Sequence, residues 1–555
     1  MSARPGREVL LEILRAEGVR YIFGNPGTTE GAIMHALEAC GDLEYLLVTQ
    51  EGVAMGMADG YARETGQPAF VNLHIETGLS NGLSLLFNAS AGGTPMVLTS
   101  ANSDVDKVAE GRTDLVELTR PFTKWGAEVT RADQLGRVMR RAFRTAKTPP
   151  TGPTYVSIAQ NVLDELTDDE VIASGDLGTS VAADQAMIEA AARVLVRAKR
   201  PALLVGDRVA QYGAVRPAVA LAELVGAAVY GASYPAMVFP TSHDHWQGLL
   251  PPYVPFYREA LADVDVLVAV GARVFHDFFK AATDVLPADA QLIQVDINQD
   301  EIARTEPVDV GIWADPGRAL QGLYSAVAAV QTDAQKAAVV HRSAVLASSS
   351  ADRRRQAGHV EQADGLSRPM SVASMMAALN EALPDEVILV DDSVSARMDL
   401  HAAVRFDERR RVHAERAGGA IGWGMGATLG VALGAPGVPV VGVIGDGSAM
   451  MTVQALWTAV AYQLPVVYVI CNNASYRILK VNLQRWFTDV LDDPSVSSKY
   501  LGMDFERPFD MAAIAQAFGA SAERVEDADE VAPAIRRALA QGGPALIDVV
   551  VDGSV

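Results

Sequence analysis

Two short polar segments near the end of the chain contain side chains that could hold a metal and a phosphate group. Residues 445–448 read GDGS and follow an apolar run, and Asn473 follows a second apolar run. Both runs predict buried parallel strands, and 449–463 predicts one helix between them. Neighbouring strand ends would place Asp446 beside Asn473. Carboxylate and amide oxygens suit Mg2+, and N–H groups that open a helix suit phosphate, so the unit predicts a Mg2+–diphosphate site. A bare GDG segment is also common as an ordinary strand-to-helix turn.

A third candidate residue, Glu51, lies in the first part of the chain. It follows a predicted strand and opens a helix at 51–64 that is rich in glycine and alanine. A carboxylate at this junction would be shielded from water and could share a proton with a bound base. Acidic residues are common in the first turn of a helix, however, where the helix dipole alone explains them. The residue types alone leave both interpretations open.

Several longer segments resemble a known family. Residues 24–30 read GNPGTTE, Glu51 stands in QEG, and 58–63 read ADGYAR. With the GDG–NN unit, these segments are similar to those of the thiamine diphosphate (ThDP) dependent 2-oxo acid decarboxylases and synthases. Within that family the chain most resembles the benzoylformate decarboxylases, through matches at 69–74, 120–125, 152–155, 239–251, 271–275 and 417–422. The resemblance therefore extends over the whole chain.

The resemblance implies two cofactors, ThDP and Mg2+. Glu51 would bond N1′ of the aminopyrimidine ring. Asp446, Asn473 and the backbone carbonyl of Ser475 would bind Mg2+. The cofactor-binding residues implied in this way are Asn25, Pro26, Gly27, Glu51, Ser395, Gly419 through its carbonyl, Ile421 as the apolar support of the bent cofactor, Gly445, Gly447, Ser448 and Tyr476.

The resemblance also implies catalytic and substrate-binding residues. His74 matches the family's active-site histidine at a strand end, although a lone histidine is more often structural. We predict that His74 donates a proton or positions the substrate, and that the Thr28 hydroxyl bonds the substrate carboxylate. Glu51, His74 and Thr28 are therefore the predicted catalytic residues.

Three positions depart from the benzoylformate decarboxylase pattern. The family's second active-site histidine aligns with Phe278, and His276 stands two residues earlier. Arg477 replaces a glycine, and it suits either an anionic substrate group or a solvated helix start. Asn482 replaces an aromatic ring. The predicted substrate pocket consists of Thr28, His74, Phe278, Arg477, Ile478, Leu479 and Asn482.

The elements that must position these residues fall into three blocks of alternating strands and helices. They predict an α/β fold of three doubly wound parallel-sheet domains. We expect a pyrimidine-binding domain at 1–170, a middle Rossmann-like domain at 185–335 and a diphosphate-binding domain at 368–555. The predicted strands are 21–24, 45–48, 69–73, 96–99, 154–157, 202–205, 228–230, 266–270, 292–296, 387–390, 440–444, 466–471 and 545–551.

Composition excludes other classes of protein. Lys and Arg total 46 against 68 Asp and Glu, and the net charge of −22 disfavours nucleic acid as a partner. No apolar run reaches the ~18 residues that span a bilayer, so no membrane partner is predicted. With no secretory signal visible, we expect a cytoplasmic protein. Because the family's cofactor bridges two subunits, the resemblance implies a homodimer or homotetramer with active sites at the subunit interface.

The expected activity is that of a carbon–carbon lyase. A small 2-oxo acid would lose CO2 and leave as an aldehyde, with ThDP as the electron sink. The alternative is a ThDP-dependent carboligase resembling acetolactate synthase, which would pass the same carbon unit to an acceptor carbonyl. A nucleotide-linked oxidoreductase is disfavoured because 206–208 read GDR and lack the GxGxxG pattern. A non-catalytic subunit is disfavoured by the intact Glu51, Asp446 and Asn473.

Overall fold

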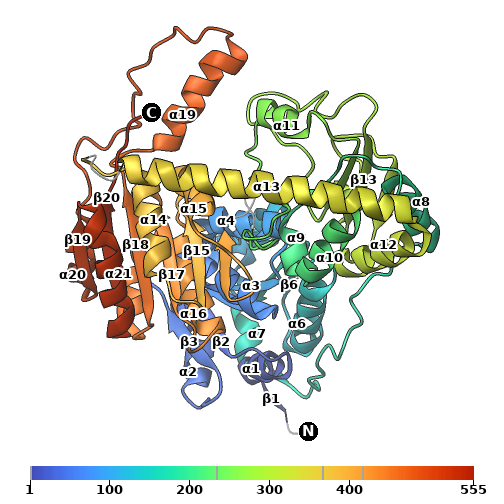
Figure 1. Cartoon of the computed structure of the whole chain (residues 1–555). Helices are drawn as coiled ribbons and strands as arrows, with labels where there is room; N and C mark the ends of the chain where they lie inside the picture. Colours follow the sequence, from blue (N-terminus) through green and yellow to red (C-terminus); the bar gives the residue numbers. More distant parts are fainter. Residues whose placement is uncertain (1–2, 233–235, 365–367, 415–417) are drawn as a thin grey trace.

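Three six-stranded parallel sheets organise the protein (Figure 1). The structure, a computed structural model, describes residues 3–232, 236–364, 368–414 and 418–555. The strand orders are β3-β2-β4-β5-β7-β6, β11-β10-β9-β12-β13-β14 and β16-β15-β17-β18-β20-β19. Apolar residues pack against both faces of each sheet, because successive side chains on a strand point to opposite faces. The predicted fold class is confirmed.

The N-terminal domain contains the first of these sheets. Its strands are β2 (Tyr21–Asn25), β3 (Glu44–Leu47), β4 (Ala69–Leu73), β5 (Met96–Asn102), β6 (Trp125–Val129) and β7 (Pro153–Ala159). Its helices are α1 (Gly6–Ala16), α2 (Gly31–Leu37), α3 (Glu51–Thr65), α4 (Ile75–Gly92), α5 (Leu115–Thr119), α6 (Ala132–Lys147) and α7 (Gln160–Asp164). A short antiparallel pair, β1 (Arg4–Pro5) and β8 (Leu166–Thr167), joins the two ends of the domain.

The middle domain contains the second sheet. Its strands are β9 (Pro201–Val205), β10 (Ala228–Gly231), β11 (Trp246–Leu249), β12 (Val266–Val270), β13 (Gln291–Asp296) and β14 (Val310–Trp313). Its helices are α8 (Gln185–Leu195), α9 (Asp207–Gln211), α10 (Val215–Val225), α11 (Val254–Leu261) and α12 (Pro316–Val330). The long helix α13 (Asp333–Asp364) then runs across one side of the molecule towards the C-terminal domain (Figure 1).

The C-terminal domain contains the third sheet. Its strands are β15 (Val387–Asp392), β16 (Arg410–Ala414), β17 (Val440–Gly445), β18 (Val466–Asn472), β19 (Ser521–Val525) and β20 (Ala545–Val550). Its helices are α14 (Val372–Ala382), α15 (Arg397–Ala403), α16 (Trp423–Gly434), α17 (Asp446–Met451), α18 (Ala455–Ala461), α19 (Arg477–Arg485), α20 (Met511–Phe518) and α21 (Ala528–Gln541). Helix α19 projects from the body of this domain (Figure 1).

The segment 449–463 differs from the single helix predicted for it. It belongs to two helices, α17 and α18, which are separated at Thr452. The Thr452 hydroxyl donates to the Gly422 carbonyl at 2.6 Å, and its backbone leaves the helical region. A side chain that bonds outside its own helix competes with helix continuation, which accounts for the break.

The N- and C-terminal domains share one apolar core through helices α3 and α16. Glycines allow the two backbones to approach closely. A Cβ atom on Gly60 would lie 2.3 Å from the Ala427 carbonyl oxygen, and one on Gly430 would lie 1.9 Å from that of Met57. Glu51 begins α3, and Ile421 stands just before α16. The contact between the two helices therefore fixes the positions of both predicted site residues. No helix among the described residues is long and apolar enough to cross a membrane.

Candidate active site

Asp446 and Asn473 follow adjacent parallel strands, β17 and β18, as the sequence predicts. Asp446 is buried, and its Oδ1 accepts from the Gly447 N–H at 2.8 Å. Its Oδ2 is buried and has no hydrogen-bond partner within the part of the chain that the structure describes. Burial raises the pKa of Asp446 to about 7, against the N–H groups of Gly447 and Ala474, which lower it. A carboxylate oxygen buried in this way suits a cation.

The loop after Asn473 completes this oxygen-rich corner. The Ser475 N–H donates to Asn473 Oδ1 at 3.0 Å, and Asn473 Nδ2 donates to the Ser395 hydroxyl at 3.3 Å. Backbone hydrogen bonds from Tyr476 and Phe505 pair the loop with the chain at 503–505. Asp446, Asn473 and the Ser475 carbonyl are hard oxygen groups, so the residues present fit the implied Mg2+.

Asp392, at the end of β15, organises the neighbouring glycine turn and was not predicted. The buried carboxylate accepts from the Gly424 N–H at 2.9 Å, from Gly422 at 3.2 Å and from the Ser448 hydroxyl. Burial raises its pKa to about 6. Gly422 has φ +94°, and a Cβ there would lie 2.6 Å from Met451 Cβ, so only glycine suits this turn. The Ser448 hydroxyl already donates to Asp392, so we expect the predicted contact with phosphate to be made by the Ser448 backbone N–H.

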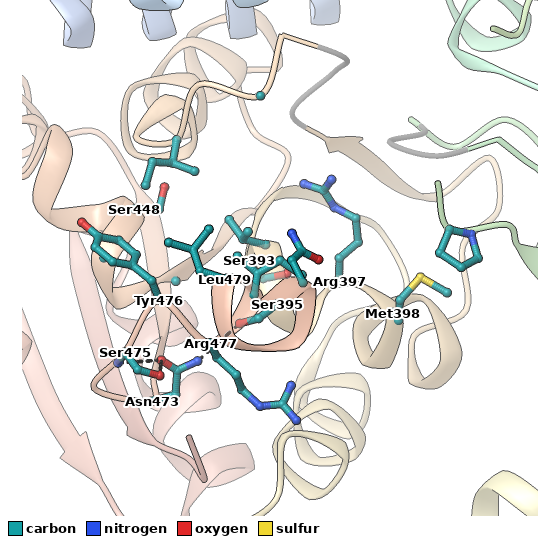
Figure 2. Close-up of a pocket in the computed structure, with 18 of the residues that line it drawn as sticks. Ser393, Ser395, Arg397, Met398, Ser448, Asn473, Ser475, Tyr476, Arg477 and Leu479 are labelled. Carbon is teal, nitrogen blue, oxygen red and sulfur yellow. Dashed lines mark hydrogen bonds between the residues drawn. The ribbon is translucent and has the colours of Figure 1, made fainter. Parts of the chain in front are cut away.

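A cleft of about 500 Å³ extends from this corner between the C-terminal and middle domains. Its lining includes every predicted cofactor residue of the C-terminal domain, namely Ser395, Gly419, Ile421, Gly445, Asp446, Gly447, Ser448, Asn473, Ser475 and Tyr476. Figure 2 shows Ser448, Tyr476 and Asn473 on one side of the view and Arg397 and Met398 on the other. The lining residues that the sequence did not predict are Leu249, Leu250, Pro251, Pro252, Tyr253, Ser393, Val394, Arg397 and Met398.

The predicted substrate residues of the last two domains also line this cleft. They are Phe278, Arg477, Ile478, Leu479 and Asn482. Arg477 donates from Nε to the Ser554 carbonyl at 2.7 Å. His276 lines a neighbouring cavity of about 210 Å³ and meets the Phe278 ring edge to face. His276 therefore does not line the cleft itself.

Glu51 is held in a separate cluster of the N-terminal domain. Its side chain is buried at the start of α3, and it accepts from Asn25 Nδ2 and Asn81 Nδ2, each at 3.0 Å. These two amide donors fix the direction of the Glu51 side chain. An acidic residue that only complements the helix dipole would not need these two partners. The structure therefore holds the Glu51 side chain in a specific hydrogen-bonded position.

His74 belongs to a network centred on the buried Glu30. Glu30 Oε2 lies 2.9 Å from His74 Nδ1 and accepts from the Gly27 N–H at 3.0 Å, while Oε1 accepts from the Ala101 N–H at 3.1 Å. A carboxylate partner assigns the proton to Nδ1 and leaves Nε2 for other contacts. Thr28 is exposed at the start of a 3-10 turn.

The predicted site residues thus form two groups in one chain. The residues Asn25, Pro26, Gly27, Thr28, Glu51 and His74 do not line the cleft that holds the C-terminal group. Each group includes residues at the carboxyl ends of the two strands where the strand order reverses, β2 and β4 in one sheet and β15 and β17 in the other, while Glu51 follows β3 and Asn473 follows β18. Such reversals are the usual ligand sites of open parallel sheets.

Comparison with known proteins agrees with this geometry. The thiamine pyrophosphate enzyme models for the N-terminal TPP binding, central and C-terminal TPP binding domains match residues 4–119, 188–323 and 392–549. Thiamine pyrophosphate is another name for ThDP. Benzoylformate decarboxylase of Pseudomonas aeruginosa is 32% identical, with 97% of each chain covered. A Mycobacterium tuberculosis protein assigned as an acetolactate synthase large subunit is also 32% identical, with 99% of each covered.

Solved structures show the same relationship. The ThDP-dependent 4-hydroxybenzoylformate decarboxylase of Rhodococcus jostii RHA1 superposes with a TM-score of 0.85 at 28% identity, covering 99% of both chains. The resemblance stated from the sequence is confirmed by matches over all three domains and nearly the full length. The chain belongs to the family of thiamine pyrophosphate enzymes.

Proposed function

We propose that this protein is a ThDP- and Mg2+-dependent decarboxylase of a 2-oxo acid, similar to benzoylformate decarboxylase, that releases CO2 and an aldehyde. One observation carries the proposal. One cleft joins an oxygen-rich corner to a largely apolar wall of Leu250, Tyr253 and Phe278. The corner contains a buried Asp446 oxygen that has no hydrogen-bond partner among the described residues. Such a cleft suits an anchored charged cofactor with an apolar substrate beyond it.

The residues of the C-terminal domain would hold the cofactor. Asp446, Asn473 and the Ser475 carbonyl would bind Mg2+, and the Gly447 and Ser448 N–H groups would meet the diphosphate. ThDP supplies an electron sink for the carbon–carbon bond that breaks. The apolar wall excludes water, which favours loss of charge as CO2 departs.

The residues of the N-terminal domain would move protons. Glu51, fixed by two asparagine amides, would share a proton with the aminopyrimidine N1′. His74 would present Nε2 to the substrate, since its Nδ1 faces Glu30. The neutral ring would orient the substrate by accepting a hydrogen bond at Nε2, and the imidazolium form would protonate it from there. The Thr28 hydroxyl would bond the substrate carboxylate. Because these groups lie outside the cleft of their own chain, we propose a homodimer, or a pair of dimers, in which a second subunit supplies them.

The decisive experiment is reconstitution of the full chain with ThDP and Mg2+, followed by CO2 release from a panel of aromatic, branched and acidic 2-oxo acids. We expect turnover of at least one 2-oxo acid and loss of that turnover when either cofactor is withheld. If the holoenzyme releases CO2 from none of them, the proposal is wrong.

The alternative activity is carboligation, as in acetolactate synthase. Two observations favour it: the relative assigned to that activity is as similar as the decarboxylase, and His276 lies outside the cleft. Product analysis with and without an added acceptor aldehyde separates the two activities. Decarboxylation is supported if the aldehyde derived from the 2-oxo acid is the main product even when the acceptor is present. Ligation is supported if the main product is a hydroxyketone that joins this aldehyde unit to the acceptor.

A further inference from the structure

The middle domain contributes an aromatic wall to the cleft, and Asp277 joins the two segments that form it. Asp277 Oδ2 accepts from the Val254 N–H at 2.8 Å, and Oδ1 accepts from the Phe279 N–H at 2.8 Å. The residues next to these donors, Tyr253 and Phe278, both line the cleft, and their rings meet edge to face with centroids 5.8 Å apart. One carboxylate therefore sets the relative position of the two rings.

Tyr253 also reaches across to the C-terminal domain. Its hydroxyl donates to Asn482 Oδ1 at 2.6 Å, and the Arg485 guanidinium lies 4.3 Å from its ring centroid. Asn482 and Arg485 are one turn apart on α19, so both reach the same ring. Burial raises the pKa of the Tyr253 phenol, so the hydroxyl stays protonated as a donor.

These contacts immobilise the Tyr253 ring between the two walls of the cleft. Tyr253 is 5% exposed, and the Arg485 guanidinium lies over its ring. Tyr253 lines the cleft together with its two neighbours, Phe278 on the middle domain and Asn482 on the C-terminal domain. Asn482 itself is short and is oriented by the tyrosine hydroxyl. A rigid ring placed between two walls limits how far a substrate side chain can extend.

We propose that Tyr253 determines which lengths of substrate side chain the cleft accepts. The inference rests on the proposed function, because the ligand is taken to be a 2-oxo acid. Tyr253 is a specificity residue in this view, since it contacts the side chain of the substrate and not the atoms that react. Its removal would lengthen the cleft towards α19 without touching the Mg2+ corner.

The test compares Tyr253→Ala with Tyr253→Phe and Phe256→Ala in the reconstituted full-length holoenzyme. Phe256 is a matched control, since it also lies against Arg485, 4.7 Å from the guanidinium, but does not line the cleft. The substrates are 2-oxobutanoate, benzoylformate and 4-phenyl-2-oxobutanoate, and kcat and KM are measured for each. We expect Tyr253→Ala to shift the ratio of kcat/KM towards the longest substrate by on the order of tenfold or more, mainly through KM.

Tyr253→Phe keeps the ring and should keep the parent's order of preference, as should Phe256→Ala. An unchanged ratio in Tyr253→Ala, or an equal shift in Phe256→Ala, would overturn the inference. If Tyr253→Ala does not fold, Tyr253→Leu replaces it and carries the same expectation. If the parent decarboxylates none of these three substrates, the wider panel of 2-oxo acids tests the proposed function separately. Calorimetric binding of the corresponding non-reacting 2-hydroxy acids then decides whether Tyr253 selects by length.

Discussion

The buried ion pair at the junction of α3 and α16 offers a sharp test of how the N- and C-terminal domains are joined. Asp59 and Arg63 lie one turn apart on α3, with side chains 0% and 2% exposed, and their closest charged atoms are 2.8 Å apart. Asp59 also accepts from the Trp423 indole N–H on α16. Replacing Asp59 with Asn keeps the size of the side chain but leaves the Arg63 charge buried without its counter-charge.

The expected loss of stability depends on the contacts that Arg63 keeps after the substitution. Leaving one charge of a buried pair unmatched costs about 3–5 kcal/mol. Arg63 retains a hydrogen bond to the Ala414 carbonyl at 2.6 Å and a position over the Trp423 ring at 4.5 Å. These contacts partly compensate, so we expect a loss of about 3 kcal/mol in the free energy of unfolding.

The assay is guanidinium-induced unfolding followed by tryptophan fluorescence at fixed protein concentration. Glu408→Gln is the control, because Glu408 forms an equally well aligned pair with Arg216, at 2.6 and 2.7 Å, on the exposed surface. Solvent and salt screen that pair, so the control should unfold with the parent. The double variant Asp59→Leu/Arg63→Met should recover much of the loss, since it leaves no unmatched charge. If Asp59→Asn unfolds together with the control, the reasoning is refuted.

Three further predictions concern the site and its pH dependence. Glu51→Gln should lower kcat on the order of 10²- to 10⁴-fold while ThDP affinity, measured by fluorescence titration, stays near that of the parent; an unchanged kcat would contradict the proton-sharing role. Asp446→Asn should weaken Mg2+ binding on the order of tenfold or more in metal titrations of reconstitution, and equal affinity would remove Asp446 from the metal site. Burial lowers the pKa of His401 from 6.5 to about 4, against Asp391, which raises it. The unfolded chain then takes up the proton first, so the free energy of unfolding should fall by about 3 kcal/mol between pH 6.5 and 4. His401→Gln should lack this contribution, and an equal fall in the variant would show that another group causes it.

The strands that sequence periodicity did not predict in the three large sheets share one physical property. They are β6, β11, β14, β16 and β19, and every one is the edge strand of its sheet. An edge strand is covered less completely than a central one, so it needs no continuous apolar run. Residues 410–414, which read RRVHA, show this clearly, whereas the central strand at 440–444 is apolar throughout. Apolar pattern therefore predicts every central strand of these sheets, but of their six edge strands it predicts β3 alone.

A similar division holds for the site. Asp446 and Asn473 could be placed together from the sequence because their separation is fixed by one strand–helix–strand unit. Asp392 acts on Gly422 and Ser448 across long stretches of chain, and the acidic end of its strand was the signal available for it. Tyr253 reaches the cleft through the docking of the middle domain on α19, a contact that local spacing does not encode. Residues positioned by one strand–helix–strand unit are thus predictable from local spacing, whereas those whose partners lie far along the chain or in another domain are not.

The positions of the site residues on the N- and C-terminal sheets give a reason why one chain would need a second subunit to complete the proposed site. In the N-terminal sheet, Asn25 ends β2 and His74 follows β4, and these strands flank the reversal of strand order. In the C-terminal sheet, Asp392 ends β15 and Asp446 follows β17 at the equivalent reversal. Each sheet would therefore present half of the proposed ligand site at its own carboxyl edge. Within one chain, the two halves line different surfaces, because the lining of the cleft comes from the middle and C-terminal domains. A second subunit that sets its N-terminal edge against this cleft would unite the proton-sharing half with the metal half, which is the physical basis for proposing a dimer.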